Sequence, residues 1–283
     1  VRERGRACGH RKLNHEDDAL PTVIVDYGFF DPPNTGEHAG TMPVLVVRER
    51  MTKYIRSHPV PTKVLEHPWG YKQLLNDLNE LGFKRLILKS DQEPGIKALC
   101  DRVKAAFSGD VVPENAPKEV HEKSNGEAEA AVKAAHGMAR TLKEHVEIHA
   151  KITIPPKHPV NAWLIEYAGV VMTLFNRGPD GLTPFQRWRG KAWKVTLPQC
   201  LEKIEYRRRT RHKLESRWRP GIFLGIKLRT TEKIVGDADG TFVAQSIRRI
   251  PEAQQWDPAL VLTIRRTPRE PTPAGATNAQ RPI

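Results

Sequence analysis

The sequence predicts an α/β domain with a mixed sheet flanked by helices, followed by a small basic β-barrel domain. Two observations predict this order. Over residues 21–194, short apolar runs alternate with patterns of helical spacing, as in an α/β layer. Over residues 195–257, short β-rich runs alternate with turn signals. A chain of 283 residues is long enough for one large domain or two modest ones.

The first elements predicted are strands. Residues 1–20 are charged and aperiodic, which is typical of a linker or a truncated N-terminal region. Residues 22–30 form a first buried strand, and the segments MPVLVVRER and MTKYIRSHPV are predicted as two more strands in a hairpin.

Helices and one further strand follow. PWGYKQLLNDLNELG has apolar residues at helical spacing, with Gly82 as its stop. KRLILKSD is a short buried strand, and PGIKALCDRVKAAF is a helix with Pro94 near its start. This order of three strands, helix, strand and helix indicates a mixed sheet.

Two longer helices complete the first domain. SNGEAEAAVKAAHGMARTLKEHVEIHA is rich in strong helix formers, and Ser124 and Glu127 stand in the S-x-x-E relation of a capping box. HPVNAWLIEYAGVVMTLFNRG is apolar on much of its surface and is predicted to be buried.

The segment 195–257 is predicted to be a small, separate β-barrel. Asp239-Gly240 is a hairpin signal within it. Residues 201–250 carry 13 Lys and Arg against 6 Asp and Glu, so this domain is expected to bind DNA. Residues 258–283 are Pro-rich and are predicted to be a disordered tail.

Charge and composition indicate the class of partner. A net charge of +13 and a pI near 9.8 predict attraction to a polyanion. No apolar run approaches the roughly 20 residues of a membrane span and no signal peptide opens the chain, so the expected polyanion is nucleic acid. The alternative is a solubilising surface charge. Cys8, Cys100 and Cys200 lie far apart, which argues against a disulfide framework and favours a reducing compartment.

Three acidic positions match the needs of a two-metal site. Asp26 ends the run VIVD, Asp91 ends RLILKSD, and a glutamate lies in SNGEAEAAVK. Two Mg²⁺ ions about 3.5–4 Å apart need hard oxygen ligands, which carboxylates on two neighbouring strands and a facing helix would supply. The alternative is that both aspartates are ordinary acids that cap turns at strand ends.

The third carboxylate is Glu127 or Glu129. The capping box gives Glu127 a structural role, and its +4 and +7 positions are alanines. Glu129 shares a helix face with basic residues at +4, +7, +11 and +14. The sequence therefore favours Glu129, with Glu127 as the alternative.

Two sets of basic residues are candidates for contacts with DNA phosphates. The first is the helix face that follows Glu129, and the second is a run in the predicted barrel. An exposed helix face, a solvated turn or a nuclear-import signal are the alternatives. The candidates are Lys133, His136, Arg140, Lys143, Arg207, Arg208, Arg209, Arg211 and Lys213.

Four motifs together resemble a known family. VIVDYG, LKSDQEPGIKAL, SNGEAEAAVK and NRGPDGLTPFQRWRG resemble the integrase core of LTR retrotransposons and retroviruses. The segment from IFLGI to QWDP resembles the region that follows the core in copia-like polyproteins. The resemblance covers roughly residues 20–260, and its specificity lies in the combination and order of the motifs.

The resemblance implies a ribonuclease-H-like fold and a D,D,E triad that binds two Mg²⁺ or Mn²⁺ ions. The family's NG-x-x-E pattern places the triad at Asp26, Asp91 and Glu129. The implied activity is trimming of DNA 3′ ends and strand transfer into target DNA. The implied partners are element ends, target DNA, further copies of the chain and other segments of a polyprotein. The implied location is a cytoplasmic particle and then the nucleus.

Some features depart from the family or leave alternatives open. Integrases carry an HHCC zinc module upstream of the core, whereas CGH at residues 8–10 offers at most two zinc ligands. The chain begins at Val1 without a methionine, as expected of a piece of a longer protein. The alternatives are a catalytically inactive DNA-binding remnant, which Ala130 after the glutamate would suit, and a bacterial-type DDE transposase. Ribonuclease H itself is disfavoured because hybrid cleavage needs no appended basic barrel.

Overall fold

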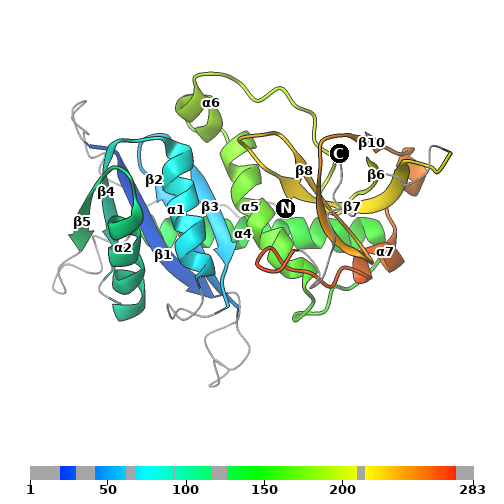
Figure 1. Ribbon diagram of the computed structural model, residues 1–283, viewed down its shortest axis with the longest axis horizontal. Coiled ribbons are helices and arrows are strands. Elements are labelled where there is room, and N and C mark those ends of the chain that lie inside the picture. The colour runs from blue at the N-terminus through cyan, green and yellow to red at the C-terminus, as the bar shows by residue number, and fades with distance from the viewer. Residues whose placement is uncertain are drawn as a thin grey trace.

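A mixed five-stranded sheet with helices is followed by a second, antiparallel five-stranded sheet, which confirms the predicted fold class (Figure 1). None of the helices that the structure describes is both long enough and apolar enough to cross a membrane. The computed structural model describes residues 20–29, 42–61, 68–91, 93–115, 126–208 and 214–271.

The first sheet has the strand order β3-β2-β1-β4-β5. Strands β1, β2 and β3 are antiparallel, whereas β4 runs parallel to β1 and β5 runs parallel to β4. This combination of order and direction is the ribonuclease-H-like arrangement. The strands are β1 (Thr22–Phe29), β2 (Pro43–Glu49), β3 (Ile55–Pro59), β4 (Arg85–Ser90) and β5 (Asp110–Asn115).

The predictions for the first four strands are confirmed, and β5 was missed. The β2–β3 hairpin and the buried strand β4 lie where the sequence placed them. Strand β5 has only two strong β-formers, Val111 and Val112, before a proline. It forms because β4 offers it six paired positions, from Arg85↔Asp110 to Ser90↔Asn115.

Helices cover both faces of the first sheet. Helices α1 (Trp69–Leu81) and α2 (Pro94–Ala106) pack on one face, over a cluster that includes Val23 and Val25 of β1. Helix α4 (Gly126–Ala150) packs on the other face, and its alanines at 131, 135 and 139 contact Val44 and Val46 of β2. Burial on both faces explains why β1 and β2 read as nearly continuous apolar runs.

The helix signals are confirmed where the structure describes them. Helix α1 ends at Gly82, whose positive φ of 79° favours glycine, and α2 begins at Pro94. Helix α5 (Val160–Phe175) is buried along most of its length, as predicted. Ser124 of the predicted capping box lies outside the described residues. Cys100 and Cys200 are buried free thiols.

The second sheet has the order β10-β6-β7-β8-β9, in which the last strand returns to pair with the first. The Asp239-Gly240 signal is confirmed, because β8 and β9 form a hairpin closed by the pair Asp237↔Gly240. The described pairings leave β9 and β10 as the two edges. The strands are β6 (Lys203–Arg207), β7 (Trp218–Ile226), β8 (Lys233–Asp237), β9 (Gly240–Ala244) and β10 (Ile247–Arg249).

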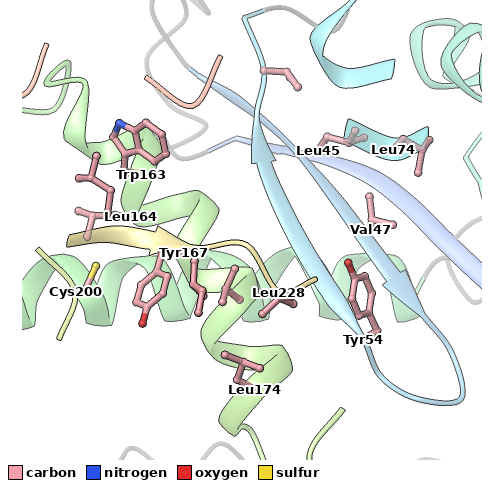
Figure 2. Packing of buried hydrophobic residues seen from close by; sticks show 14 of the residues in the cluster. Leu45, Val47, Tyr54, Leu74, Trp163, Leu164, Tyr167, Leu174, Cys200 and Leu228 are labelled. Atoms are coloured by element: carbon pink, nitrogen blue, oxygen red, sulfur yellow. The ribbon is translucent and has the colours of Figure 1, made fainter. Parts of the chain in front are cut away.

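The second sheet is not the separate unit that the sequence suggested. Phe223 of β7 is fully buried, and its ring meets the edge of Tyr167 of α5 with 5.5 Å between centroids. Figure 2 shows Leu164 and Tyr167 of α5 close to Cys200 and Leu228. Helix α5 therefore packs against β3 with one face and against the second sheet with the other, so that one hydrophobic core spans both sheets.

The disordered tail predicted from residue 258 is wrong for residues 258–271. Helix α7 (Pro258–Leu262) is capped by Asp257, and Val261 and Ile264 are fully buried. The indole N–H of Trp163 donates to the carbonyl of Arg266 at 2.7 Å. Val261 and Ile264, three residues apart, are enough to anchor this Pro-rich segment on the hydrophobic core. Residues 272–283 lie outside the described residues.

Helix α6 (Pro184–Arg189) was also missed, because six residues give too little periodicity. A capping motif at its start would have predicted this helix. Thr183 and Gln186 form a reciprocal capping box, and Gly190 ends the helix with a φ of 67°.

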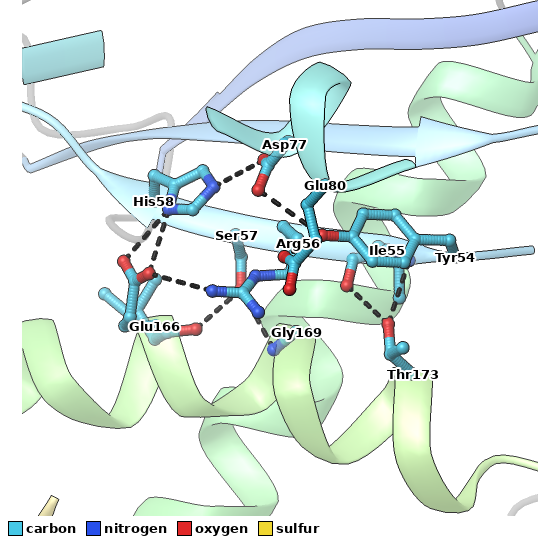
Figure 3. Close-up of polar contacts among 11 residues, drawn as sticks. Tyr54, Ile55, Arg56, Ser57, His58, Asp77, Glu80, Glu166, Gly169 and Thr173 are labelled. Carbon is cyan, nitrogen blue, oxygen red and sulfur yellow. Dashed lines mark hydrogen bonds and ion pairs between the residues drawn. The ribbon is translucent and has the colours of Figure 1, made fainter. Parts of the chain in front are cut away.

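A buried charged network fastens β3 to α1 and α5 (Figure 3). His58 is fully buried, with its Nε2 atom 2.7 Å from Asp77 of α1 and its Nδ1 atom 3.0 Å from Glu166 of α5. Arg56 lies 3.6 Å from Glu166, and the hydroxyl oxygen of Tyr54 lies 3.4 Å from Asp77. These residues hold the β3 edge between the two helices.

His58 is positively charged at neutral pH. Burial by itself lowers the pKa of His58, but the carboxylates of Glu166 and Asp77 outweigh burial and raise the pKa to about 10. Removing the imidazolium would leave Asp77, which is 3% exposed, without its charged partner. Breaking a buried pair in this way costs about 3–5 kcal/mol.

We predict a pH dependence of stability that comes from His58. Its folded pKa of about 10 lies above the ordinary value of 6.5, so the folded state binds the proton more tightly. The stabilisation is complete below pH 6.5, and it falls between pH 6.5 and 10 by up to about 1.4 kcal/mol per pH unit. Urea unfolding at pH 6.5, 8 and 9.5 measures this slope. The variant His58→Gln should be less stable and should lack the slope, and equal slopes in both proteins would contradict the assignment.

Candidate functional site

Asp26 and Asp91 occupy corresponding positions just past the paired segment of β1 and β4. The two strands are paired in parallel from Thr22↔Ile87 to Ile24↔Lys89, so each β1 residue lies beside the β4 residue 65 positions later. Continued two residues past the paired segment, this register sets Asp26 beside Asp91, which directly follows the end of β4.

Both aspartates lie on the face of the sheet that α4 covers. Val25 and Leu88 belong to the core under α1 and α2, and side chains alternate along a strand. Asp26 and Asp91 therefore point to the opposite face. Each carboxylate is also held by the backbone, because Asp26 Oδ1 accepts from the N–H of Tyr27 at 2.8 Å and Asp91 Oδ1 accepts from the N–H of Glu93 at 3.1 Å.

Two cations share this face and were missed by sequence reasoning. Arg48 of β2 lies opposite Ile24, and Lys89 of β4 lies beside Ile24 on its other side. Burial lowers the pKa of Arg48, and the nearby carboxylate of Glu127 opposes that effect. The alternation in VLVVRER, combined with the strand pairing, is the signal that would have placed Arg48 here.

Helix α4 approaches β1 closely at one glycine. A Cβ atom on Gly28 would lie 2.5 Å from Cγ1 of Val132 and 2.7 Å from Nε2 of His136. Gly28 is two residues after Asp26 and therefore lies on the same face of the sheet. The contact brings the first turns of α4 over the end of β1 that carries Asp26.

Glu129 and Glu127 lie on opposite flanks of α4. Two residues span about 200° of an α-helix. Val132 and His136 follow Glu129 by three and seven residues, so Glu129 shares the flank that contacts β1. Glu127 instead forms an ion pair with Arg50, which follows β2, with 2.8 Å between Oε2 and Nη2.

The carboxylates do not form a closed metal cluster. Within the described ranges, no three His, Cys, Asp or Glu side chains are grouped as metal ligands. Glu129 is 64% exposed, and its carboxylate lies 2.6 Å from the ammonium of Lys133. Asp26 and Asp91 nevertheless supply hard oxygen ligands at the ends of two adjacent strands, which is the donor set that Mg²⁺ or Mn²⁺ prefers.

The basic face of α4 is only partly open. Lys133 and Arg140 are exposed, whereas Lys143 lies 3.4 Å from Glu147 in an ion pair within the helix. His136 is half-buried against β1, and burial, together with the charge of Arg140, lowers its pKa. Lys133 and Arg140 are thus the cations on this face best placed to meet a phosphate backbone.

The described residues of the second basic run, Arg207 and Arg208, are not exposed. Arg208 is buried, and its guanidinium lies 3.2 Å from Asp239 and 5.3 Å from the centre of the Phe242 ring, so its contacts are internal to the second sheet. Arg207 is half-buried at the end of β6, opposite Trp218. Arg209, Arg211 and Lys213 lie outside the described residues.

We predict that the substitution Gly28→Ala destabilises the protein. Its new methyl group would meet Val132 and His136 at distances no packed side chains adopt, so α4 must move away from β1. Overpacking of this kind costs about 1–3 kcal/mol. Gly137→Ala is the matched control, because nothing lies within 4 Å of its added Cβ and alanine favours a helix interior by about 1 kcal/mol. Urea unfolding should separate the two variants, and equal stability would contradict the close contact.

Solved structures of retroviral integrases are similar to this chain. The integrase catalytic core domain of HTLV-2 in complex with magnesium has a TM-score of 0.40 in its trimeric form, with 13% identity over 60% of this chain and 97% of that chain. The simian T-cell lymphotropic virus intasome in complex with PP2A regulatory subunit B56 gamma has a TM-score of 0.39, with 12% identity over 82% of this chain and 83% of that chain. No protein-family model and no curated protein matches the sequence. Because these scores are low, the fold assignment depends on the strand order and directions described above.

Proposed function

We propose that this chain is the integrase region of an LTR retrotransposon polyprotein of the copia-like type. Its proposed reactions are metal-dependent trimming of DNA 3′ ends and transfer of those ends into target DNA. The observation that supports the proposal is the parallel pairing of β1 with β4, whose register, continued by two residues, aligns Asp26 with Asp91 in a sheet of ribonuclease-H-like order. The four sequence motifs and the second, basic domain also support this proposed function.

The proposed catalytic residues are Asp26, Asp91 and Glu129. They would hold two Mg²⁺ or Mn²⁺ ions, which when bound activate the attacking oxygen and stabilise the leaving oxygen in displacement at phosphorus. Asp26 and Asp91 are kept in place by their backbone hydrogen bonds. Glu129 must leave Lys133 to join them, and an exposed pair of this kind contributes only about 0–1 kcal/mol.

The position of each glutamate around α4 favours Glu129 over Glu127 as the third metal ligand. Glu129 lies on the flank that contacts β1, whereas Glu127 lies on the other flank and is held by Arg50, which is 19% exposed. Release of Lys133 from Glu129 on metal binding would also leave that ammonium available to a DNA phosphate. One movement would thus assemble the acid and supply a cation.

The proposed partners are DNA and further copies of the chain. Lys133 and Arg140 would contact phosphates beside the carboxylates, and the positive second domain would bind DNA without reading its sequence. Other segments of the polyprotein are proposed as further partners. A cytoplasmic particle followed by the nucleus is the proposed location.

A catalytically inactive DNA-binding remnant is the second candidate. The observation that favours it is that both glutamates are engaged by cations, Glu127 by Arg50 and Glu129 by Lys133. The two candidates differ in one measurement, because only the active enzyme joins DNA ends to a target in the presence of Mg²⁺ or Mn²⁺.

We predict that Asp91→Asn abolishes strand transfer, with a loss of at least about 10³-fold, because a neutral amide cannot replace a carboxylate on the metal. DNA affinity should be unchanged or higher, since a negative charge near the phosphates is removed. Asp101→Asn, an exposed acid on α2, is the control with the same chemical change. Retained transfer by Asp91→Asn would contradict the site, and no transfer by the unaltered chain would favour the inactive remnant.

We predict that Glu129→Gln and Glu127→Gln have different effects. Glu129→Gln should abolish Mg²⁺-dependent transfer and leave the free energy of unfolding nearly unchanged, because its side chain is exposed. Glu127→Gln should keep transfer and lose up to about 1 kcal/mol of stability with its ion pair to Arg50. The opposite pattern of activities would make Glu127 the third ligand.

A further inference from the structure

A large cavity lies between α1, α5 and the second sheet, and none of the candidate carboxylates lines it. Its volume is about 840 Å³, within the range of roughly 300–1,000 Å³ that is typical of small-molecule sites. Residues of both domains line it, so this interdomain cavity exists only because the second sheet packs on α5.

Large apolar side chains line much of the interdomain cavity. Trp69 comes from α1, Tyr167 and Val170 from α5, Leu224 from β7 and Phe242 from β9. Three of these five are aromatic. Such walls favour the flat, apolar body of a ligand over a bare ion.

Two of the three acids in the wall lie against cations. Asp77 and Glu166 both contact the charged His58, and Glu166 also lies 3.6 Å from Arg56. Glu80 accepts a hydrogen bond from the hydroxyl of Tyr54 at 3.1 Å. In the network of Figure 3, Arg56 and His58 therefore offset two of the three carboxylates and leave one negative charge on this side of the cavity.

The remaining charged residues that line the cavity are cations. Arg189, Lys227 and Arg229 are exposed, and within the described ranges none of them forms a salt bridge. The guanidinium of Arg189 stacks on the Trp188 ring, 3.7 Å from its centre, which fixes its position. Glu232 is the acid in the same turn as Lys227 and Arg229, and it accepts from the Thr230 hydroxyl at 2.7 Å.

We propose that the interdomain cavity binds a small organic anion with a flat apolar body. The body lies among Trp69, Tyr167 and Phe242, and the anionic head lies at the three cations, Arg189, Lys227 and Arg229. The ligand touches both domains, so binding stabilises the packing of the second sheet on α5. This site is independent of the proposed transfer of DNA ends.

A matched pair of fluorescent probes tests the ligand class. 1-Anilinonaphthalene-8-sulfonate is a flat aromatic anion, and N-phenyl-1-naphthylamine has nearly the same body without the charge. The folded chain should bind the sulfonate at one saturable site, at least about tenfold more tightly than the neutral probe, and its melting temperature should rise. Equal affinity for the two probes would overturn the anionic part of the proposal, and no saturable binding would overturn the site.

Charge variants test the three cations. The triple variant Arg189→Gln, Lys227→Gln and Arg229→Gln should lower sulfonate affinity at least about tenfold and leave the neutral probe unaffected. The triple variant Lys72→Gln, Lys104→Gln and Lys157→Gln removes the same charge from exposed positions outside the cavity and should bind as the unaltered chain does. Equal losses in both variants would show a general charge effect and overturn the assignment of the head group.

A filling variant tests the location. Gln73 of α1 is half-buried and lines the cavity, so Gln73→Trp should reduce the affinity for both probes at least about tenfold. Lys72→Trp places the same side chain on the neighbouring exposed position, outside the cavity, and should have no effect. Near-UV circular dichroism and cooperative unfolding must first show that each variant is folded, and only folded variants are compared. Full binding by Gln73→Trp would place the probe elsewhere and overturn the proposal.

Discussion

The parallel pairing of β1 with β4 is the constraint on which the candidate site depends. Its register, continued by two residues, aligns Asp26 with Asp91, and it is fixed by packing on both sides of the sheet. Val23 and Val25 are fully buried under α1 and α2, while Ile24 is buried on the other face. Because side chains alternate along a strand, a slip of one residue would turn Asp26 into the apolar core under α1 and α2 and move Val23 and Val25 to the opposite face. The hydrophobic pattern of β1 thus determines which face of the sheet carries Asp26.

The third acid depends on a second constraint, which is the distance between α4 and the sheet. Gly28 has no side chain, so Val132 and His136 lie directly against the β1 backbone. The same contact buries His136 and lowers its pKa, which makes it a packing residue more than a phosphate ligand. On the outer edge of the sheet, the network around His58 fastens β3 to α1 and α5, and α5 in turn supports the second sheet. The site, the buried network and the interdomain cavity are thereby parts of one packed unit.

Strong local patterns predicted the elements that position the site. The apolar runs ending in Asp26 and Asp91, the helical spacing of α1 and α4, and the Asp239-Gly240 turn were all readable, because each is determined by neighbours in sequence. What failed depends on tertiary contacts. Strand β5 is stabilised by β4, the segment 258–271 is anchored by the burial of Val261 and Ile264, and Arg208 is drawn inward by Asp239. The roles of Arg48 and Lys89 needed the strand pairing, which a single sequence does not contain.

Anomalous diffraction from crystals of the chain soaked in Mn²⁺ tests most directly whether these acids form one metal site. The register of β1 on β4 predicts a manganese peak between the carboxylates of Asp26 and Asp91, with Glu129 turned away from Lys133 and into coordination. Manganese held by Glu127, or aspartates that bind none under conditions where the chain is folded, would contradict the proposed site.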